Sequence, residues 1–341
     1  MDEVRVGSKT IGPGEKVFII AEAGINHDGD IARAHELVNA AADAGADAIK
    51  FQTHLADAEM LDVSDTAVYL NESLFALIRR MELTFDQHVA LKQAAERRGL
   101  IFLSTPFSRE AVDLLEKVGV SAYKVGSGEL TNLPLMDHIA RTGKPMLIST
   151  GMSDLGEVET TVKFLKTRRA PLAVFQCTTQ YPAKPEMMHL GVMAEYTKRF
   201  DVPVGLSDHS QGNYMSFAAV ALGALMIERH FTISRSWPGP DQPASLEPAE
   251  LADLVRGVRQ IEVALDADKQ ASQPERDLQQ FFRESVVTVR PVTKGGALTR
   301  ENTWVKRPGY GIPAAKLDEV IGRKLARDLK AGEVVKWEDL A

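Results

Sequence analysis

Residues 17–53, VFIIAEAGINHDGDIARAHELVNAAADAGADAIKFQT, decide the fold because they hold one complete strand–helix–strand unit. The apolar runs at 17–22 and 47–53 are typical of strands that are buried on both faces. Between them, residues 31–45 repeat apolar side chains at helical spacing, and Gly45 supplies the stop. A strand, a helix and a second strand in this order indicate parallel pairing with a right-handed crossover.

The same alternation continues along most of the chain. The expected strands are 17–22, 47–53, 100–106, 122–126, 145–150, 172–178, 202–206 and 225–231. The expected helices are 31–45, 84–99, 108–118, 133–142, 154–168, 186–199, 212–223 and 248–267. Eight such units predict an α/β TIM barrel. An open doubly wound sheet is the main alternative, but no Gly-rich dinucleotide loop follows the first strand.

A second, smaller domain follows the last helix. The barrel is expected over residues 1–270, a polar linker that contains Pro274 over 271–280, and a β-rich module over 281–341. Within the module, residues 293–304 resemble residues 329–340 at a spacing of 36 residues, which aligns Gly296 with Gly332. Two similar turn–strand units predict a compact pseudo-symmetric module.

Composition excludes several classes of protein. The 341 residues carry a formal net charge of -7, which gives no electrostatic support for non-specific nucleic-acid binding. A single cysteine, Cys177, and an acidic N-terminus without a basic leader predict a cytoplasmic location. No apolar run is long enough to predict a membrane span.

Reactive side chains follow every predicted strand, at the barrel end where TIM-barrel sites are built. They are Glu22, Lys50, Gln52, Thr105, Lys124, Ser127, Glu129, Ser149, Thr150, Thr178, Thr179, Tyr181, Ser207, Asp208, His209, Glu228 and His230. A single Ser or Thr there is ordinary, because loops begin at strand ends. The complete set predicts an active site.

Lys50 and Lys124 each interrupt an apolar strand, and lysines are seldom buried without a partner. One interpretation is a buried ion pair with Glu22 or Glu129. The other is a cationic pocket for a ligand that carries a phosphate and a carboxylate, assisted by the glycines and hydroxyls at 126–128 and 149–151.

His209 and His230 end adjacent strands, so their imidazoles can share one metal ion. Asp208 and Glu228 lie beside them. A histidine that only satisfies hydrogen bonds is the alternative interpretation. Two protein ligands would leave coordination positions open for substrate and water. The remaining histidines, apart from His27, are predicted to lie on the surface.

Taken together, these motifs resemble the sialic acid synthases, which condense phosphoenolpyruvate with a sugar. The matching stretches are 20–29 (IAEAGINHDG), 49–53 (IKFQT), 104–108 (STPFS), 123–129 (YKVGSGE), 148–152 (ISTGM), 177–182 (CTTQYP), 205–210 (GLSDHS) and 227–231 (IERHF). The C-terminal module, with VKRPG at 305–309, resembles the antifreeze-like (SAF) domain of these enzymes.

The resemblance implies a metal-dependent condensation of phosphoenolpyruvate with an open-chain, N-acetylmannosamine-type aldehyde. It implies Mn²⁺ or Mg²⁺ on His209 and His230, and a domain-swapped homodimer in which Arg307 reaches the partner's sugar. It assigns catalytic roles to Glu22, Lys50, Lys124, Glu129 and Glu228, and phosphoenolpyruvate contacts to Thr105, Ser127, Ser149 and Ser207. It places Gln52, Thr179, Tyr181 and Asp241 on the sugar side.

Two positions depart from the family pattern and leave the acceptor open. Asn is frequent in the family where Thr179 stands, and His is frequent where Gln242 stands. N-acetylmannosamine, its 6-phosphate and a diacetamido-trideoxyhexose that yields a legionaminate-type or pseudaminate-type acid all remain candidates. Another phosphoenolpyruvate aldolase would not explain the C-terminal module. An ice- or glycan-binding protein would not explain the buried charges.

Overall fold

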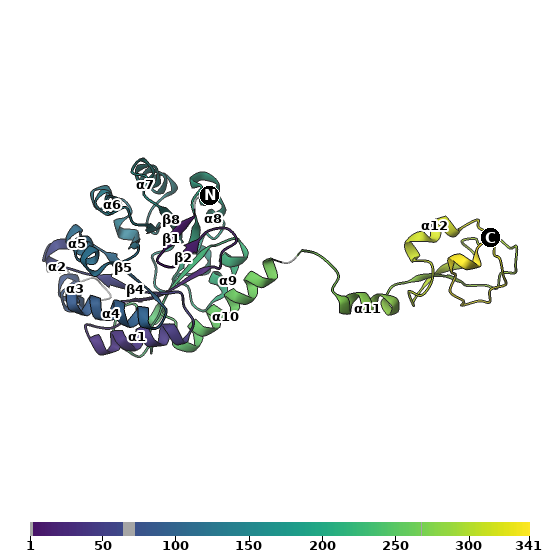
Figure 1. The fold of residues 1–341 in the computed structure, drawn as a ribbon, viewed down its shortest axis with the longest axis horizontal. Coiled ribbons are helices and arrows are strands. Elements are labelled where there is room, and N and C mark those ends of the chain that lie inside the picture. The colour runs from purple at the N-terminus through teal and green to yellow at the C-terminus, as the bar shows by residue number, and fades with distance from the viewer. Residues whose placement is uncertain (1–2, 64–71, 267) are drawn as a thin grey trace. The chain divides into compact units, whose positions relative to one another are not determined.

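The first of two structural units is a closed barrel of parallel strands (Figure 1). The computed structural model describes residues 3–63, 72–266 and 268–341, and its units are Met1–Asp266 and Ala267–Ala341. Among the described residues, eight strands pair in the order β10-β3-β4-β5-β6-β7-β8-β9. They are β3 (Phe18–Gly24), β4 (Ala48–Thr53), β5 (Ile101–Pro106), β6 (Tyr123–Val125), β7 (Met146–Ser149), β8 (Leu172–Cys177), β9 (Val204–Asp208) and β10 (Met226–His230). The predicted TIM barrel is confirmed.

A helix follows each barrel strand and covers the outside of the barrel (Figure 1). These helices are α1 (Ile31–Asp43), α4 (Phe85–Arg97), α5 (Arg109–Val118), α6 (Leu133–Ala140), α7 (Leu155–Thr167), α8 (Val192–Phe200), α9 (Tyr214–Ala221) and α10 (Pro248–Leu265). α8 begins later than predicted because Pro185–Met187 forms a separate 3₁₀ turn. Residue 267, the expected end of the last helix, lies outside the described residues. None of the helices that the structure describes is long and apolar enough to cross a membrane.

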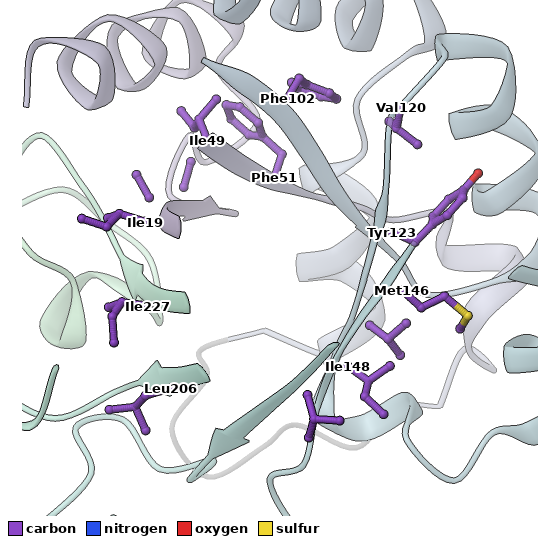
Figure 2. Close-up of a cluster of buried hydrophobic side chains, with 14 of the residues drawn as sticks. Ile19, Ile49, Phe51, Phe102, Val120, Tyr123, Met146, Ile148, Leu206 and Ile227 are labelled. Carbon is purple, nitrogen blue, oxygen red and sulfur yellow. The ribbon is translucent and has the colours of Figure 1, made fainter. Parts of the chain in front are cut away.

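The period of two along each strand sorts side chains into an outer and an inner set. Outward residues such as Ile19, Phe51 and Ile227 pack against the helices in the main core, which Figure 2 shows along the strands. The inward positions are apolar where the strands begin, as with Phe18 and Leu147. They become polar where the strands end, so the reactive side chains form the top layer of the barrel interior.

An N-terminal hairpin closes the opposite end of the barrel, and the sequence pattern did not predict it. β1 (Val4–Val6) pairs antiparallel with β2 (Lys9–Ile11) across a turn at Gly7, whose φ is 57°. Its buried residues join the inward apolar layer, which consists of Val4, Val6, Ile11, Phe18, Ile20, Ala48, Leu103, Ala122, Leu147, Ala173, Phe175 and Met226. Two other helices that were not predicted, α2 (Ala56–Glu59) and α3 (Leu74–Met81), precede α4.

The second unit has its own small core and begins with a helix where a linker was expected. α11 (Gln273–Phe282) occupies most of 271–280, because Ser272 and Glu275 form a capping box and Pro274 lies in the first turn. β11 (Ser285–Thr288) then pairs antiparallel with β12 (Thr303–Lys306), and a short helix, α12 (Leu317–Val320), follows. The core consists of Val286, Val292, Leu298, Ile312, Val320, Leu325, Leu329 and Val335.

The internal repeat of this unit is real, but its spacing is 37 residues rather than the expected 36. Val292 and Leu329 exchange backbone hydrogen bonds with each other. The Gly295 N–H donates to Leu325 O, and the Gly332 N–H donates to Thr288 O. Gly332 lies 37 residues after Gly295, and Leu325 lies 37 residues after Thr288, so the two bonds are equivalent in the two repeats. Gly295, not Gly296, therefore matches Gly332, and both adopt a positive φ.

Candidate active site

Two buried lysines lie side by side in the polar top layer of the barrel. Lys50 Nζ is 2.9 Å from Glu22 Oε1 and 3.8 Å from Glu228 Oε2. Lys124 Nζ is 3.5 Å from Glu228 Oε1, so Glu228 lies between the two ammonium groups. The lysines also donate to hydroxyls, Lys50 to Thr105 Oγ1 at 3.0 Å and Lys124 to Ser149 Oγ at 2.5 Å.

The ion pairs differ in part from the expected ones. Lys50 pairs with Glu22 as considered from the sequence, whereas the partner of Lys124 is Glu228. Glu129 forms no ion pair with either lysine among the described residues. It belongs to a 3₁₀ turn, Ser127–Glu129, and its Oε2 atom is buried without a hydrogen-bond partner in the part of the chain that the structure describes.

Burial gives the carboxyl groups of this layer different proton affinities. Burial raises the pKa of Glu22 to about 7 although Lys50 lies beside it, and burial likewise raises the pKa of Glu129 to about 7. Burial also acts on Glu228, but the ammonium groups of Lys124 and Lys50 outweigh it and lower its pKa. Two carboxyl groups that can exchange protons near neutrality thus lie beside one that stays ionised.

The other two expected hydroxyl ligands, Ser207 and Ser127, do not bond to the lysines but to other groups. Ser207 Oγ donates to Glu228 Oε1 at 3.1 Å, and Ser127 Oγ accepts from the Gly151 N–H at 3.0 Å. A Cβ atom at Gly151 would lie 2.2 Å from Thr179 Oγ1 and 2.7 Å from Ser127 Oγ. Gly151 therefore permits a close approach of backbone and hydroxyls that any larger residue would prevent.

The two expected metal-ligating histidines face each other beside this layer. Their ring centroids are 5.2 Å apart, and the ring of Tyr181 stacks on His209 at 4.3 Å. His209 Nδ1–H donates to Thr178 O at 2.8 Å, so Nε2 is the nitrogen that could ligate a metal ion. Burial lowers the pKa of His230 well below its usual value, so this imidazole is neutral. His230 Nδ1 lies 3.7 Å from Asp241 Oδ2.

These residues fit a divalent ion with open coordination positions. The buried polar atoms that have no hydrogen-bond partner among the described residues include His230 Nδ1, Glu22 Oε2 and Glu228 Oε2. Within the same residues, no group of three or more His, Cys, Asp or Glu side chains is placed to hold a metal ion. An ion on the two imidazoles would therefore take its other ligands from substrate and water.

A buried ion pair shapes the loop that carries His209. Arg229 Nη1 donates to Asp208 Oδ2 at 2.7 Å and to Gly212 O at 2.8 Å, while Nη2 donates to Ser210 O at 2.7 Å. Both side chains of the pair are 0% exposed. Asp208 is thus a structural residue of the β9 end rather than a side chain of the polar layer.

Two buried histidines contradict the prediction that they lie on the surface. His88 is 0% exposed, and its ring contacts the Thr53 hydroxyl, with 2.9 Å between Nε2 and Oγ1. His54 is 4% exposed and joins the site through Gln52, with 3.0 Å between His54 Nε2 and Gln52 Oε1. Lys50, Gln52 and His54 are two residues apart along the strand, so the strand alternation predicts that the His54 side chain faces the same side as Lys50 and Gln52.

The remaining expected residues occupy separate places. Gln242 is buried, and its Nε2 donates to Asn26 O at 3.2 Å and to Pro238 O at 3.3 Å. Its Oε1 has no hydrogen-bond partner among the described residues. Arg307 belongs to the second unit, where its guanidinium lies 5.6 Å from the ring centroid of Phe282.

Comparisons with known proteins give one consistent result for both units. A model of the NeuB family matches residues 37–270, and a model of the SAF domain matches residues 283–341. An N,N'-diacetyllegionaminic acid synthase of Campylobacter jejuni is 39% identical over 94% of this chain and 99% of its own length. The N-acetylneuraminate-9-phosphate synthase of Homo sapiens is 34% identical over 96% of this chain and 94% of its own.

A solved structure extends this similarity to three dimensions. The N-acetylneuraminic acid synthetase of Leptospira borgpetersenii has a TM-score of 0.73 and 32% identity, and the match covers 81% of this chain and 94% of that chain.

Proposed function

Since the chain belongs to the NeuB family, we propose that it condenses phosphoenolpyruvate with the open-chain aldehyde of an N-acetylmannosamine-type sugar. The products are N-acetylneuraminate, or a close relative, and inorganic phosphate. The observation that carries this proposal is the pair of buried lysines with its surrounding hydroxyls at one end of a barrel. A small substrate that bears both a phosphate and a carboxylate needs such a set of cations and donors.

The reaction forms one carbon–carbon bond and one carbon–oxygen bond to water, and it breaks the carbon–oxygen bond to phosphate. The enol carbon of phosphoenolpyruvate attacks the aldehyde carbon, water adds at C2, and phosphate leaves to give the 2-keto acid. Lys50 and Lys124 neutralise the charge on the phosphate and carboxylate, with Thr105, Ser127, Ser149 and Ser207 as further donors. Glu22 and Glu129, whose pKa values lie near 7, are suited to exchange the protons.

A divalent ion completes the proposed site. His209 and His230 would hold it, and Mn²⁺ or Mg²⁺ would supply Lewis-acid polarisation of the aldehyde when bound. The support is the orientation of His209, whose Nδ1 is held by Thr178 O, together with the neutral His230. Metal dependence itself remains a prediction, as does the cytoplasmic location.

Gln52, Thr179, Tyr181 and Asp241 are the residues that we assign to the sugar. A diacetamido-trideoxyhexose is the second candidate acceptor, because the legionaminic acid synthase of Campylobacter jejuni is 39% identical whereas the human 9-phosphate synthase is 34% identical. Thr179 and Gln242, which depart from the family pattern, are the positions most relevant to this choice.

We further propose a homodimer in which the SAF domain of one subunit caps the barrel of the other and delivers Arg307. The two units carry opposite charge, which supports such an association. Residues 267–341 hold 14 Lys and Arg against 11 Asp and Glu, whereas residues 1–266 hold 26 against 36.

A phosphate-release assay with phosphoenolpyruvate and a panel of hexosamine acceptors, with mass detection of the product, tests the reaction. The panel contains N-acetylmannosamine, its 6-phosphate and a diacetamido-trideoxyhexose. We expect release only when an aldehyde sugar is present, and loss of release after exhaustive chelation. Release without any acceptor would contradict the condensation, and full turnover after chelation would contradict the metal.

A further inference from the structure

A chain of hydrogen bonds leads from the edge of the barrel mouth to Lys50. Glu59 Oε1 is 2.9 Å from His54 Nδ1, and His54 Nε2 is 3.0 Å from Gln52 Oε1. Gln52 Nε2 then donates to Glu22 Oε1 at 3.2 Å, and Glu22 Oε1 lies 2.9 Å from Lys50 Nζ. The chain thus joins the proposed sugar side of the site to the proposed phosphoenolpyruvate side.

The chemistry of the two ends fixes the orientation of the Gln52 amide. Glu22 Oε1 also accepts from the Lys50 ammonium group, so a reversed amide would place the Gln52 oxygen against an oxygen that already acts as an acceptor. The nitrogen of Gln52 therefore faces Glu22, and its oxygen faces His54. His54 Nε2 must then carry a hydrogen to complete the bond.

The other nitrogen of His54, Nδ1, shares a hydrogen bond with the Glu59 carboxyl group. His54 thus bridges the Glu59 carboxyl group and the Gln52 amide oxygen. The side chains of His54 and Glu59 are only 4% and 5% exposed, so water screens this pair little.

Neighbouring elements hold the pair in place. The ring of His54 stacks on Phe107, which follows β5, with 4.3 Å between the centroids. The second carboxylate oxygen of Glu59 accepts from the Leu55 N–H at 3.2 Å, which ties the short helix α2 to the end of β4. The pair is therefore rigid before any ligand arrives.

We propose that His54 and Glu59 are positioning residues, which hold the Gln52 amide so that one N–H stays on Glu22 and the other is presented to a sugar oxygen. This inference rests on the proposed function, which places Gln52 on the sugar side. An amide held in one orientation loses no rotamer freedom when the acceptor binds. The nitrogens of His54 act only through Gln52 and do not touch the reacting atoms.

Two amide substitutions separate the two bonds of His54. The amide nitrogen of Asn takes the place of imidazole Nδ1, so His54→Asn keeps a donor for Glu59 and loses the one for Gln52. The amide nitrogen of Gln takes the place of Nε2, so His54→Gln keeps a donor for Gln52. Both variants lose the aromatic stacking on Phe107, which controls for packing. His138→Asn, at a half-buried histidine that is 2.8 Å from Asp113 and lies away from the site, is the matched control for the loss of a histidine–carboxylate pair.

The kinetic test compares kcat/KM for the sugar and KM for phosphoenolpyruvate in these variants, with thermal melts as the check on folding. We expect His54→Asn to lower kcat/KM for the sugar by about 30-fold to 100-fold, as misplacement of a positioning group does. We expect KM for phosphoenolpyruvate to be unchanged, and His54→Gln and His138→Asn to retain most activity. Equal losses in His54→Asn and His54→Gln would overturn the proposal.

A spectroscopic test decides the matter independently of the reaction. In protein with ¹⁵N-labelled histidine, we expect His54 Nε2 to carry a hydrogen, and His54→Gln to identify the signals. An Nε2 without a hydrogen would overturn the proposal even if the enzyme is active. If the wild type releases no phosphate with any acceptor, the proposed function fails, while the nitrogen spectrum still accepts or rejects the fixed orientation of Gln52.

Discussion

Lys124 tests the charge balance of the site most directly, because it is buried and shares Glu228 with Lys50. We expect Lys124→Ala to leave one anionic group of the substrate uncompensated, which costs about 2 to 4 kcal/mol in the transition state. The value of kcat/KM should therefore fall by about two to three decades. Lys117→Ala, on the exposed face of α5, is the control. A loss below about threefold at Lys124 would remove it from the catalytic set.

His27 gives the fold a defined dependence on acid. Burial lowers the pKa of His27 to about 4, and its Nδ1 accepts from the Gly29 N–H at 3.0 Å, a bond that requires an unprotonated nitrogen. Below the ordinary pKa of 6.5, His27 therefore binds a proton in the unfolded chain but not in the folded protein. The free energy of unfolding falls as the pH is lowered to about 4.

Urea unfolding at pH 7 and pH 4.5 measures this effect. We expect the free energy of unfolding of the wild type to drop between the two values by about 2 kcal/mol more than that of His27→Asn. His189→Asn, at an exposed position, should retain the full drop. The same drop in all three proteins would show that other groups cause the acid sensitivity.

At the level of single residues, the sequence predicted the site side chains that lie at alternate positions of a barrel strand. Lys50 and Lys124 are polar interruptions of apolar runs, so the pattern identified them. The pairing of Lys124 with Glu228 rather than Glu129 could not be predicted, because it depends on which side chains reach across the barrel interior. The His54–Glu59 pair was missed because a helix of only four residues brings Glu59 back to the strand end.

The β9–β10 pair shows what one buried ion pair contributes to an element. We expect Arg229→Met to destabilise the protein by about 3 to 5 kcal/mol, since Asp208 would remain as an uncompensated buried charge. The carbonyls of Ser210 and Gly212 would lose their donor as well.

The matched control for this prediction is Arg199→Met. Arg199 pairs with Glu195 on the exposed surface of α8, at 2.7 Å, and such pairs contribute little. Thermal and urea unfolding of both variants should show a large loss for Arg229 only. Equal losses would mean that the buried pair contributes no more to stability than the exposed pair.

Elements were predictable where the hydrophobic pattern is long. Most barrel strands and their helices satisfy this condition, whereas β6, with three residues, was predicted from its place in the strand–helix alternation. The strands β1 and β2 have three residues each, too few to show a period. The helix α11 was missed because Pro274 was taken as a breaker, although Ser272 and Glu275 have the spacing of a capping box and proline is favoured in a first helical turn.

For the whole molecule, the proposed domain-swapped dimer makes a specific prediction about mixtures. Arg307→Ala removes the capping guanidinium and His209→Ala removes a metal ligand, so we expect each variant alone to be nearly inactive. A mixed dimer would contain one site with an intact barrel and an intact arginine. Mixing and re-equilibrating the two variants should therefore restore activity.

Native mass spectrometry of the mixture verifies that mixed dimers form, and two portions of the Arg307→Ala protein mixed with each other serve as the control. Mixed dimers without regained activity would mean that the module caps its own barrel, or that another residue does the capping.

The pairing of β10 with β3 has a consequence for how the protein is made. β3 is the first barrel strand to leave the ribosome, and its second neighbour is the last, so one edge of the nascent sheet stays open until residues 226–230 have been synthesised. At about 5 to 20 residues per second, that interval is on the order of ten to forty seconds. The burial of Val4 and Val6 is delayed equally long, because Met226 completes the apolar layer that buries them. Translational pauses before this point prolong the exposure of an unpaired strand edge, and pauses after it do not.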